Sequence, residues 1–246
     1  MMQAQGLANV QRVAAGLAAA LFMLSAVGGC ASHVDAQAAK DRAACPRAAA
    51  PAYVVRLELP KPRIDDSLTL AQIGERTHAS YRYLTVGATL SNLLIVGVAS
   101  SRVAPAIGGG SCAYPQQVSL VLALGERVIH VAREFRGTEP CVYREVLDHE
   151  RRHVALDDKL LSEEKAELPA ALPARFADLD GVWGKDEHAA RGALQTRLQA
   201  DTQALQTEIE DKRHAAHAAQ IDTFEERHRL ENACGGRLKE LYPGLH

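Results

Sequence analysis

The sequence predicts an α+β fold: a small, mostly antiparallel sheet, then a helix that carries the motif His-Glu-x-x-His, then a long C-terminal helix. Three observations predict it. Runs of β-branched and apolar residues, separated by turn signals, occupy residues 52–135. From Cys141 onward the apolar period changes from two residues to about 3.6 residues, which is the period of a helix. After a stretch rich in proline and glycine, a second helical pattern continues to Ala233.

The N-terminus has the pattern of an export signal. The run "VAAGLAAALFMLSAV" is too short for a membrane span and has the length of a signal-peptide core. It ends in "VGGC", which resembles the bacterial lipobox, where cleavage leaves the cysteine as the lipidated N-terminus. We therefore expect a lipoprotein signal peptide over residues 1–29 and lipidation of Cys30. The alternative is an ordinary signal peptide cut after Ala31, and both predict an exported chain.

Residues 30–51 are rich in alanine, with scattered charges and no apolar period, so we expect a tether there and a domain over residues 52–246. Residues 52–59 predict the first strand, which Pro60 ends. The segment "DDSLTLAQIGERTH" predicts a short helix that begins near Asp66 or Ser67.

Further strands follow this helix. The segment "YRYLTVGATLSNLLIVGVAS" predicts extended chain with a turn near Ser91 and Asn92, and residues 101–115 predict a loop. The runs "QVSLVLAL" and "RVIHVAREF" flank a turn at Gly125 and Glu126, so we expect them to pair as a hairpin.

Two helices complete the predicted domain. The first begins after Thr138, its expected N-cap, and runs to about Glu167, where Pro169 and Pro173 should end it. The second begins near Asp186 and ends at "CGG" after Ala233. The apolar positions of the second helix form a thin seam: Leu194, Leu198, Leu205, Ile209, Ala216 and Ala219.

The first helix carries the chemistry. His149 and His153 lie four residues apart, so one helix face presents both imidazoles about 6 Å from each other, close enough to bind one zinc ion. Glu150 points about 100° around the helix axis and can reach a water on that ion. Zinc lowers the pKa of such a water, and the carboxylate accepts its proton. We therefore expect His149 and His153 to bind zinc and Glu150 to be the catalytic base.

Two readings of the surrounding charges stay open. Because Arg151 and Arg152 fill the two middle positions, the segment could also be a solvated, charged helix face. Asp157 continues the stripe but lies about 12 Å along the axis from His149, too far to share its ion. It either orients His153 or is solvated.

The segment "LDHERRHVALD" resembles the signature of zincin-type metallopeptidases. The wider arrangement, with a hairpin, a cysteine before the helix and a long second helix, resembles a bacterial family of predicted secreted zinc-dependent proteases. Its members carry an Asp and a His some tens of residues after the motif, and in "QIDTFEERH" Asp222 and His228 occupy the comparable place. We expect His228 to be the third metal ligand, with Asp222 or His217 as substitutes. Further oxygen and nitrogen donors on the long helix are Glu187, His188 and Glu208.

Four cysteines remain if Cys30 carries lipid, an even number that suits an oxidising compartment. Four cysteines allow three pairings. We expect Cys112 to pair with Cys141, tying the loop before the strands to the start of the motif helix. We expect Cys45 to pair with Cys234, tying the tether to the end of the last helix.

These features together predict a zinc-dependent peptidase, a hydrolase of the bacterial cell envelope that acts on peptide or protein substrates. By resemblance to lipoprotein sorting, it would face the periplasm from the outer membrane, held by its lipid. The formal net charge of −2 gives no basic excess of the kind that binds nucleic acid. One alternative is a non-catalytic envelope lipoprotein that binds a partner through its long helix. Another is a zinc hydrolase of amide bonds in cell-wall peptides.

Overall fold

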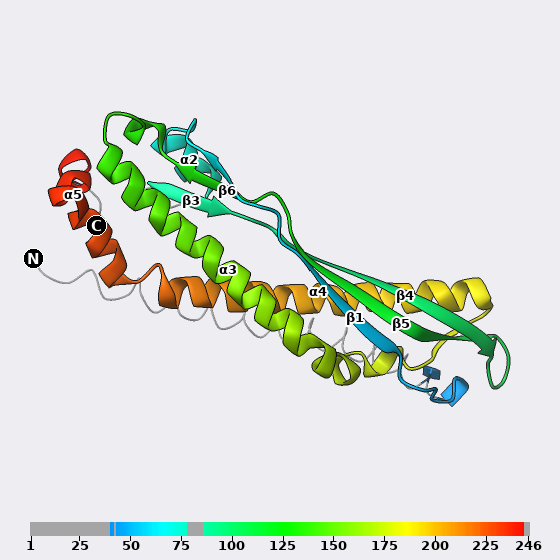
Figure 1. Ribbon diagram of the computed structural model, residues 1–246. Helices are drawn as coiled ribbons and strands as arrows, with labels where there is room; N and C mark the ends of the chain where they lie inside the picture. Colours follow the sequence, from blue (N-terminus) through cyan, green and yellow to red (C-terminus); the bar gives the residue numbers. More distant parts are fainter. Residues whose placement is uncertain (1–39, 42, 78–85, 244–246) are drawn as a thin grey trace, which may run out of the picture. The chain divides into compact units, whose positions relative to one another are not determined.

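The computed structural model describes residues 40–41, 43–77 and 86–243, shown in colour in Figure 1. The expected signal peptide and Cys30 lie outside this part of the chain. The chain divides into two compact units. Of the described residues, one unit contains those up to Ala49, with Ser101–Tyr114 and Asp178–Leu194, and the other contains those within Ala50–Ser100, Pro115–Ala177 and from Gln195 onward.

The smaller unit contains the end of the expected tether. Cys45 and Cys112 form a disulfide there, and both side chains are buried with Tyr114. The first residues of β5 (Ser111–Leu124) pair antiparallel with β7 (Val182–Gly184). The tether's last residues therefore pack into a folded unit.

The strands are arranged in two sheets. In the first, β1 (Ala52–Glu58) runs parallel to β5, and β4 (Leu93–Pro105) lies on the other side of β5. In the second, β6 (Val128–Val131) lies between β2 (Arg63–Asp65), which is parallel to it, and β3 (Gly87–Leu90), which is antiparallel. The α+β fold class is confirmed, with the strands divided between two sheets rather than one.

The predicted hairpin of residues 117–124 and 127–135 is wrong, because β5 and β6 belong to different sheets. The connections β1–β2, β3–β4 and β5–β6 each carry the chain from one sheet to the other (Figure 1). Arg127 holds the last connection in place: its buried guanidinium donates to the carbonyl oxygens of Pro60 and Val154. The sequence pattern did not indicate that the arginine next to the predicted turn is buried.

The short helix α2 (Leu70–Arg76) begins later than expected. Its N-cap is Thr69, whose hydroxyl accepts from the backbone N–H of Gln72 while the Gln72 side chain accepts from Thr69 N–H. Asp65 instead accepts hydrogen bonds from the N–H and hydroxyl of Ser67. The two reciprocal hydrogen bonds between Thr69 and Gln72 form a capping box, and they place the helix start after the earlier polar residues Asp66 and Ser67.

The motif helix α3 (Pro140–Arg175) starts at N-cap Glu139 rather than Thr138 and continues past the expected end. Pro169 and Pro173 lie inside it. Each proline removes a backbone hydrogen bond, but Leu168 and Leu172, which directly precede the two prolines, are buried. Their packing keeps this segment helical, so the predicted end near Glu167 is wrong.

The long second helix is interrupted where the sequence predicted continuity. Helix α4 (Glu187–Gln220) ends before Ile221, and α5 (Phe224–Leu241) starts at N-cap Thr223, whose hydroxyl accepts from the N–H of Glu226. The "CGG" stop is confirmed: the backbone from Ala233 to Gly236 is not helical. A long C-terminal helix is therefore present, but a turn at residues 221–223 divides it from α5.

Both predicted disulfides are wrong. Cys45 pairs with Cys112, and Cys141 pairs with Cys234, with Cα–Cα distances of 5.7 and 5.9 Å. The expected Cys112–Cys141 pair requires the chain before β5 to lie beside the start of α3, as it would in a β5–β6 hairpin. Because that hairpin does not form, Cys141 in the first turn of α3 instead meets Cys234 on α5, the helix that packs against α3.

The core of the larger unit lies between the second sheet and helices α3 and α5. It is built from Leu70, Ile73, Ala88, Ile129, Val131, Ala132, Phe135, Val142, Val146, Leu147, Val154, Leu230 and Leu238. Among the helices that the structure describes, none has the length and apolarity required to cross a membrane. The two disulfides fit an exported protein.

Candidate metal centre

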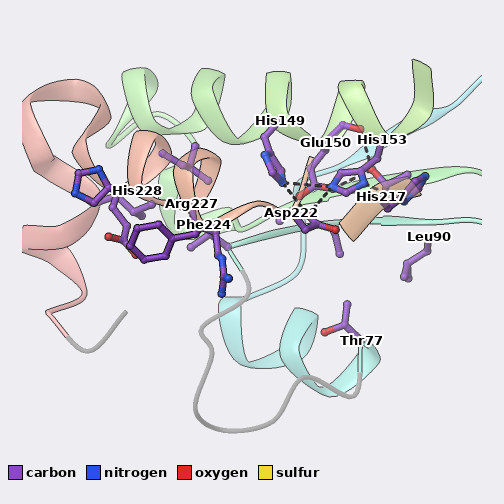
Figure 2. Close-up of a pocket in the computed structure, with 17 residues that line it drawn as sticks. Thr77, Leu90, His149, Glu150, His153, His217, Asp222, Phe224, Arg227 and His228 are labelled. Atoms are coloured by element: carbon purple, nitrogen blue, oxygen red, sulfur yellow. Dashed lines mark hydrogen bonds and ion pairs between the residues drawn. The ribbon is translucent and has the colours of Figure 1, made fainter. Parts of the chain in front are cut away.

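The two histidines of the motif point to the same place. His149 and His153 lie on adjacent turns of α3 and are nearly buried, with 9% and 8% of their surface exposed. Their Nε2 atoms face each other at 3.3 Å (Figure 2). A solvated, charged helix face would leave these rings in water, so the burial argues against that alternative.

Asp222 completes the group from the turn between α4 and α5. Its Oδ1 lies 3.6 Å from His149 Nε2 and 3.2 Å from His153 Nε2. Ligands bound to zinc at 2.0–2.2 Å in tetrahedral geometry are about 3.3–3.5 Å from one another. The three observed separations are therefore close to the edges of one face of such a tetrahedron, which leaves its fourth corner for a water or substrate.

The charges around these atoms agree with cation binding. Burial would raise the pKa of Asp222, but hydrogen bonds from His149 and His153 outweigh it and hold that pKa well below its usual range. Burial would likewise lower the pKa of His149, but contacts with Asp222 and other carboxylates raise it. A carboxylate that stays ionised beside two imidazoles is a suitable donor set for zinc.

The expected third ligand, His228, is not part of this group. It lies on α5 and is exposed, with its ring stacked near that of Phe224 (Figure 2). Its side chain also contacts Asn232. The turn at residues 221–223 directs Asp222 towards the motif, whereas His228 follows it by more than one turn of a new helix. The structure therefore favours Asp222, one of the two expected substitutes.

The other candidates lie elsewhere. His217 Nδ1 faces His153 Nδ1 at 3.1 Å, and its Nε2 faces Asp157, so neither nitrogen points at the other ligand atoms. Glu208 is bonded to Arg175 and Glu187 to Arg191. In the part of the chain that the structure describes, the group able to hold a metal is His149, His153 and Asp222.

Glu150 is held beside this group. It is buried, and the Thr89 hydroxyl on β3 lies 2.9 Å from its Oε2. Burial raises the pKa of Glu150, while the two histidines oppose this shift. Gly87 makes the arrangement possible, because a Cβ there would lie 2.6 Å from Val146 Cγ1 and 2.9 Å from Glu150 Oε1.

The outer nitrogen of His149 has an acidic partner that the sequence did not reveal. His149 Nδ1 lies 3.4 Å from Glu226 Oε1. Arg152 and Arg229 both donate to Glu226, and these bonds hold its pKa well below the usual range. Arg152 therefore has a structural role in the motif, since it fixes the carboxylate that orients a candidate ligand. Arg151 instead pairs with exposed Asp148.

This difference between neighbouring arginines gives a testable prediction. Arg152→Ala should weaken zinc binding by about tenfold, because outer partners of metal-binding histidines contribute on that scale. Arg151→Ala, one residue away and equally positive, should leave zinc affinity unchanged. Competition titration against a chromogenic zinc chelator measures both, and equal affinities for the two variants would contradict this role of Glu226.

Asp157 is buried rather than solvated, with 1% of its surface exposed. Arg213 donates to both of its oxygens, at 3.0 and 2.7 Å, and His217 Nε2 lies 2.8 Å from Oδ1. Burial would raise the pKa of Asp157, but these hydrogen bonds hold it well below its usual range. Asp157 therefore touches His217 and not His153 directly.

A pocket of about 560 Å³ opens onto the group. Its wall contains the whole of β3, with His149, Glu150, His153 and Asp222, and apolar side chains from α5 (Figure 2). His130 on β6 is 1% exposed and does not line the pocket. The group thus faces a cavity large enough for part of a substrate.

Sequence reasoning missed the positions that depend on the turn before α5. A local signal existed: Thr223 and Glu226 form the Thr-x-x-Glu pattern of a helix start, which divides the long helical stretch beside Asp222. Thr89 and the link from His217 to Asp157 had no such signal, because they depend on tertiary packing. No protein-family model, curated protein or solved structure matches the chain.

Proposed function

We propose that the chain is a zinc-dependent peptidase of the bacterial cell envelope that hydrolyses peptide bonds with a metal-activated water. The observation that carries this proposal is the convergence of His149 Nε2, His153 Nε2 and Asp222 Oδ1 at separations of 3.3, 3.6 and 3.2 Å. Two neutral imidazoles and one carboxylate, with a fourth position open, are typical of catalytic zinc sites.

Zinc held by these residues would polarise the scissile carbonyl and lower the pKa of the water it coordinates. Glu150 would accept the proton of the attacking water and donate it to the leaving amine. Its burial favours this role, because a raised pKa brings a carboxylate closer to neutral pH. The Thr89 hydroxyl would hold the carboxylate in position between the two proton transfers.

An extended substrate would bind along β3. The neighbouring strand β6 cannot take this role, because it is central in its sheet, with β2 and β3 on its two edges. In the described part of the chain β3 pairs with β6 on one side only, and its residues line the pocket beside Glu150. An edge strand can accept a peptide backbone as an additional strand, so β3 is the better candidate.

The location of the activity follows from the N-terminal sequence and the cysteines. Two disulfides support export to an oxidising compartment. We further propose that Cys30 carries the lipid, that the anchor is in the outer membrane, and that the substrates are envelope peptides or proteins. The resemblance of "LDHERRHVALD" to secreted zinc-dependent proteases supports the same assignment.

The non-catalytic alternative receives less support. It requires the apolar seam of the long helix to be free for a partner. Leu198, Leu205 and Ile209 are buried, with at most 1% of their surface exposed. The seam is therefore used within the chain as far as Ile209, and its last position, Ala219, is exposed, so little of it is left for a partner.

Two alanine variants test the ligand set. Asp222→Ala should remove a ligand and abolish stoichiometric zinc binding at micromolar zinc, whereas His228→Ala should bind zinc as the wild type does. Equilibrium dialysis with elemental analysis measures the zinc content of each. A wild-type chain that binds no zinc would overturn the proposed function, and loss of zinc in His228→Ala alone would restore the ligand set expected from the sequence.

A further inference from the structure

The proposed reaction does not use His217, although its imidazole lies directly behind a candidate ligand (Figure 2). His217 is near the end of α4, and its ring centroid is 4.8 Å from that of His153. Its two nitrogens each have one partner: Nδ1 faces His153 Nδ1 at 3.1 Å, and Nε2 faces Asp157 Oδ1 at 2.8 Å. The ring thus links a ligand histidine to a buried carboxylate.

The position of each proton follows from this order of contacts. Asp157 accepts two hydrogen bonds from Arg213, so it is ionised and can only accept. His217 Nε2 must therefore carry a proton and donate it. In a neutral imidazole the other nitrogen is an acceptor, so His217 Nδ1 accepts from His153 Nδ1–H.

The same rule applied to His153 gives the functional consequence. With its proton on Nδ1, a neutral His153 has a lone pair on Nε2 that can bind a metal; with the proton on Nε2, it donates to Asp222 instead. Without a metal these two contacts compete, because His217 Nδ1 accepts from Nδ1–H and Asp222 Oδ1 accepts from Nε2–H. The contact with His217 therefore favours the form of His153 that can be a ligand.

We propose that His217 is a positioning residue that favours the metal-binding tautomer of His153 through a chain of hydrogen bonds from His153 to His217 to Asp157. The proposal rests on the metal site proposed above and names the group that prepares it. Metal-binding histidines commonly donate their second N–H to a carboxylate or carbonyl. Here a second imidazole spans the gap, since Asp157 on the same helix contacts His217 rather than His153.

Three variants at one position separate the two hydrogen bonds of His217. Asparagine can place its side-chain oxygen where Nδ1 lies and keep the bond from His153. Glutamine reaches the place of Nε2 and keeps only the bond to Asp157, and alanine keeps neither. His217→Ala and His217→Gln should lower zinc affinity by about 10- to 100-fold, and His217→Asn should lose less. His188→Ala, an exposed histidine on the same helix that does not line the pocket, is the control.

The second measurement needs no metal. In the full chain purified in detergent without zinc, nitrogen NMR of labelled histidine should show a measurable share of His153 protonated on Nδ1. In His217→Ala and His217→Gln the His153 signals should shift towards the other tautomer, while the amide spectrum of the core stays that of the wild type. A role of His217 in packing alone would leave the tautomer unchanged.

The outcomes keep this inference apart from the proposed function. If the wild type binds zinc and His217→Ala shows both unchanged affinity and an unchanged His153 tautomer, the role of His217 is refuted and the peptidase proposal stands. If the wild type binds no zinc, the proposed function fails. The tautomer measured without metal still supports or refutes the hydrogen-bond chain.

Discussion

Glu150→Gln should abolish peptide hydrolysis while zinc remains bound. Glutamine has the shape of glutamate and can still accept from the Thr89 hydroxyl, but it cannot accept a proton from the attacking water. General base catalysis contributes about 10²- to 10⁴-fold to a rate, so kcat should fall by that factor. Cleavage of a fluorogenic peptide library and zinc content by elemental analysis give the two readouts.

Glu163→Gln is a matched control on the same helix, because Glu163 is exposed and lines no part of the pocket. It should retain full activity. Cleavage by Glu150→Gln at the wild-type rate would rule out Glu150 as the base. Running the assay with both protein-derived peptides and cell-wall peptides also shows which class of amide bond is hydrolysed.

Removing the disulfide between Cys141 and Cys234 should destabilise the larger unit and weaken its zinc site. The bond closes a loop with a sequence separation of 93 residues, and loops of this length correspond to about 4.6 kcal/mol of unfolding free energy. It ties α5 to the first turn of α3, and α5 carries Glu226, which contacts His149. A double serine variant should therefore unfold at lower denaturant concentration and bind zinc less tightly.

The other disulfide provides the control. Cys45 and Cys112 both lie in the smaller unit and close a loop with a sequence separation of 67 residues, so their removal should cost a similar free energy. That variant should keep the zinc affinity of the wild type, since neither cysteine belongs to the unit that contains the site. Equal loss of zinc affinity in both variants would contradict a specific role of the Cys141–Cys234 bond.

The sequence predicted the elements whose signals are local. Strand β1 and the start of α3 agree with their apolar periods within a few residues, and the spacing of His149 and His153 predicted their convergence. Helix geometry alone determines that convergence, because residues four apart lie on one face of any α-helix.

The predictions that were wrong concern features that depend on tertiary contacts. The turn signal between β5 and β6 predicts a hairpin, but the two strands belong to different sheets. Buried Arg127 holds the segment between them where the chain passes from one sheet to the other. The third ligand depends on where a long helical pattern is interrupted, and the apolar period continues across that turn. The disulfide pairing could not be predicted either, because it depends on which helix packs against the start of α3.

The central claim is that His149, His153 and Asp222 hold one zinc ion. Crystals of the zinc-loaded chain, measured on both sides of the zinc absorption edge, test it most directly. The account predicts one anomalous peak about 2.0–2.2 Å from His149 Nε2, His153 Nε2 and Asp222 Oδ1. A peak bound by His217 or His228 in place of Asp222, or no peak between the two motif histidines, would contradict it.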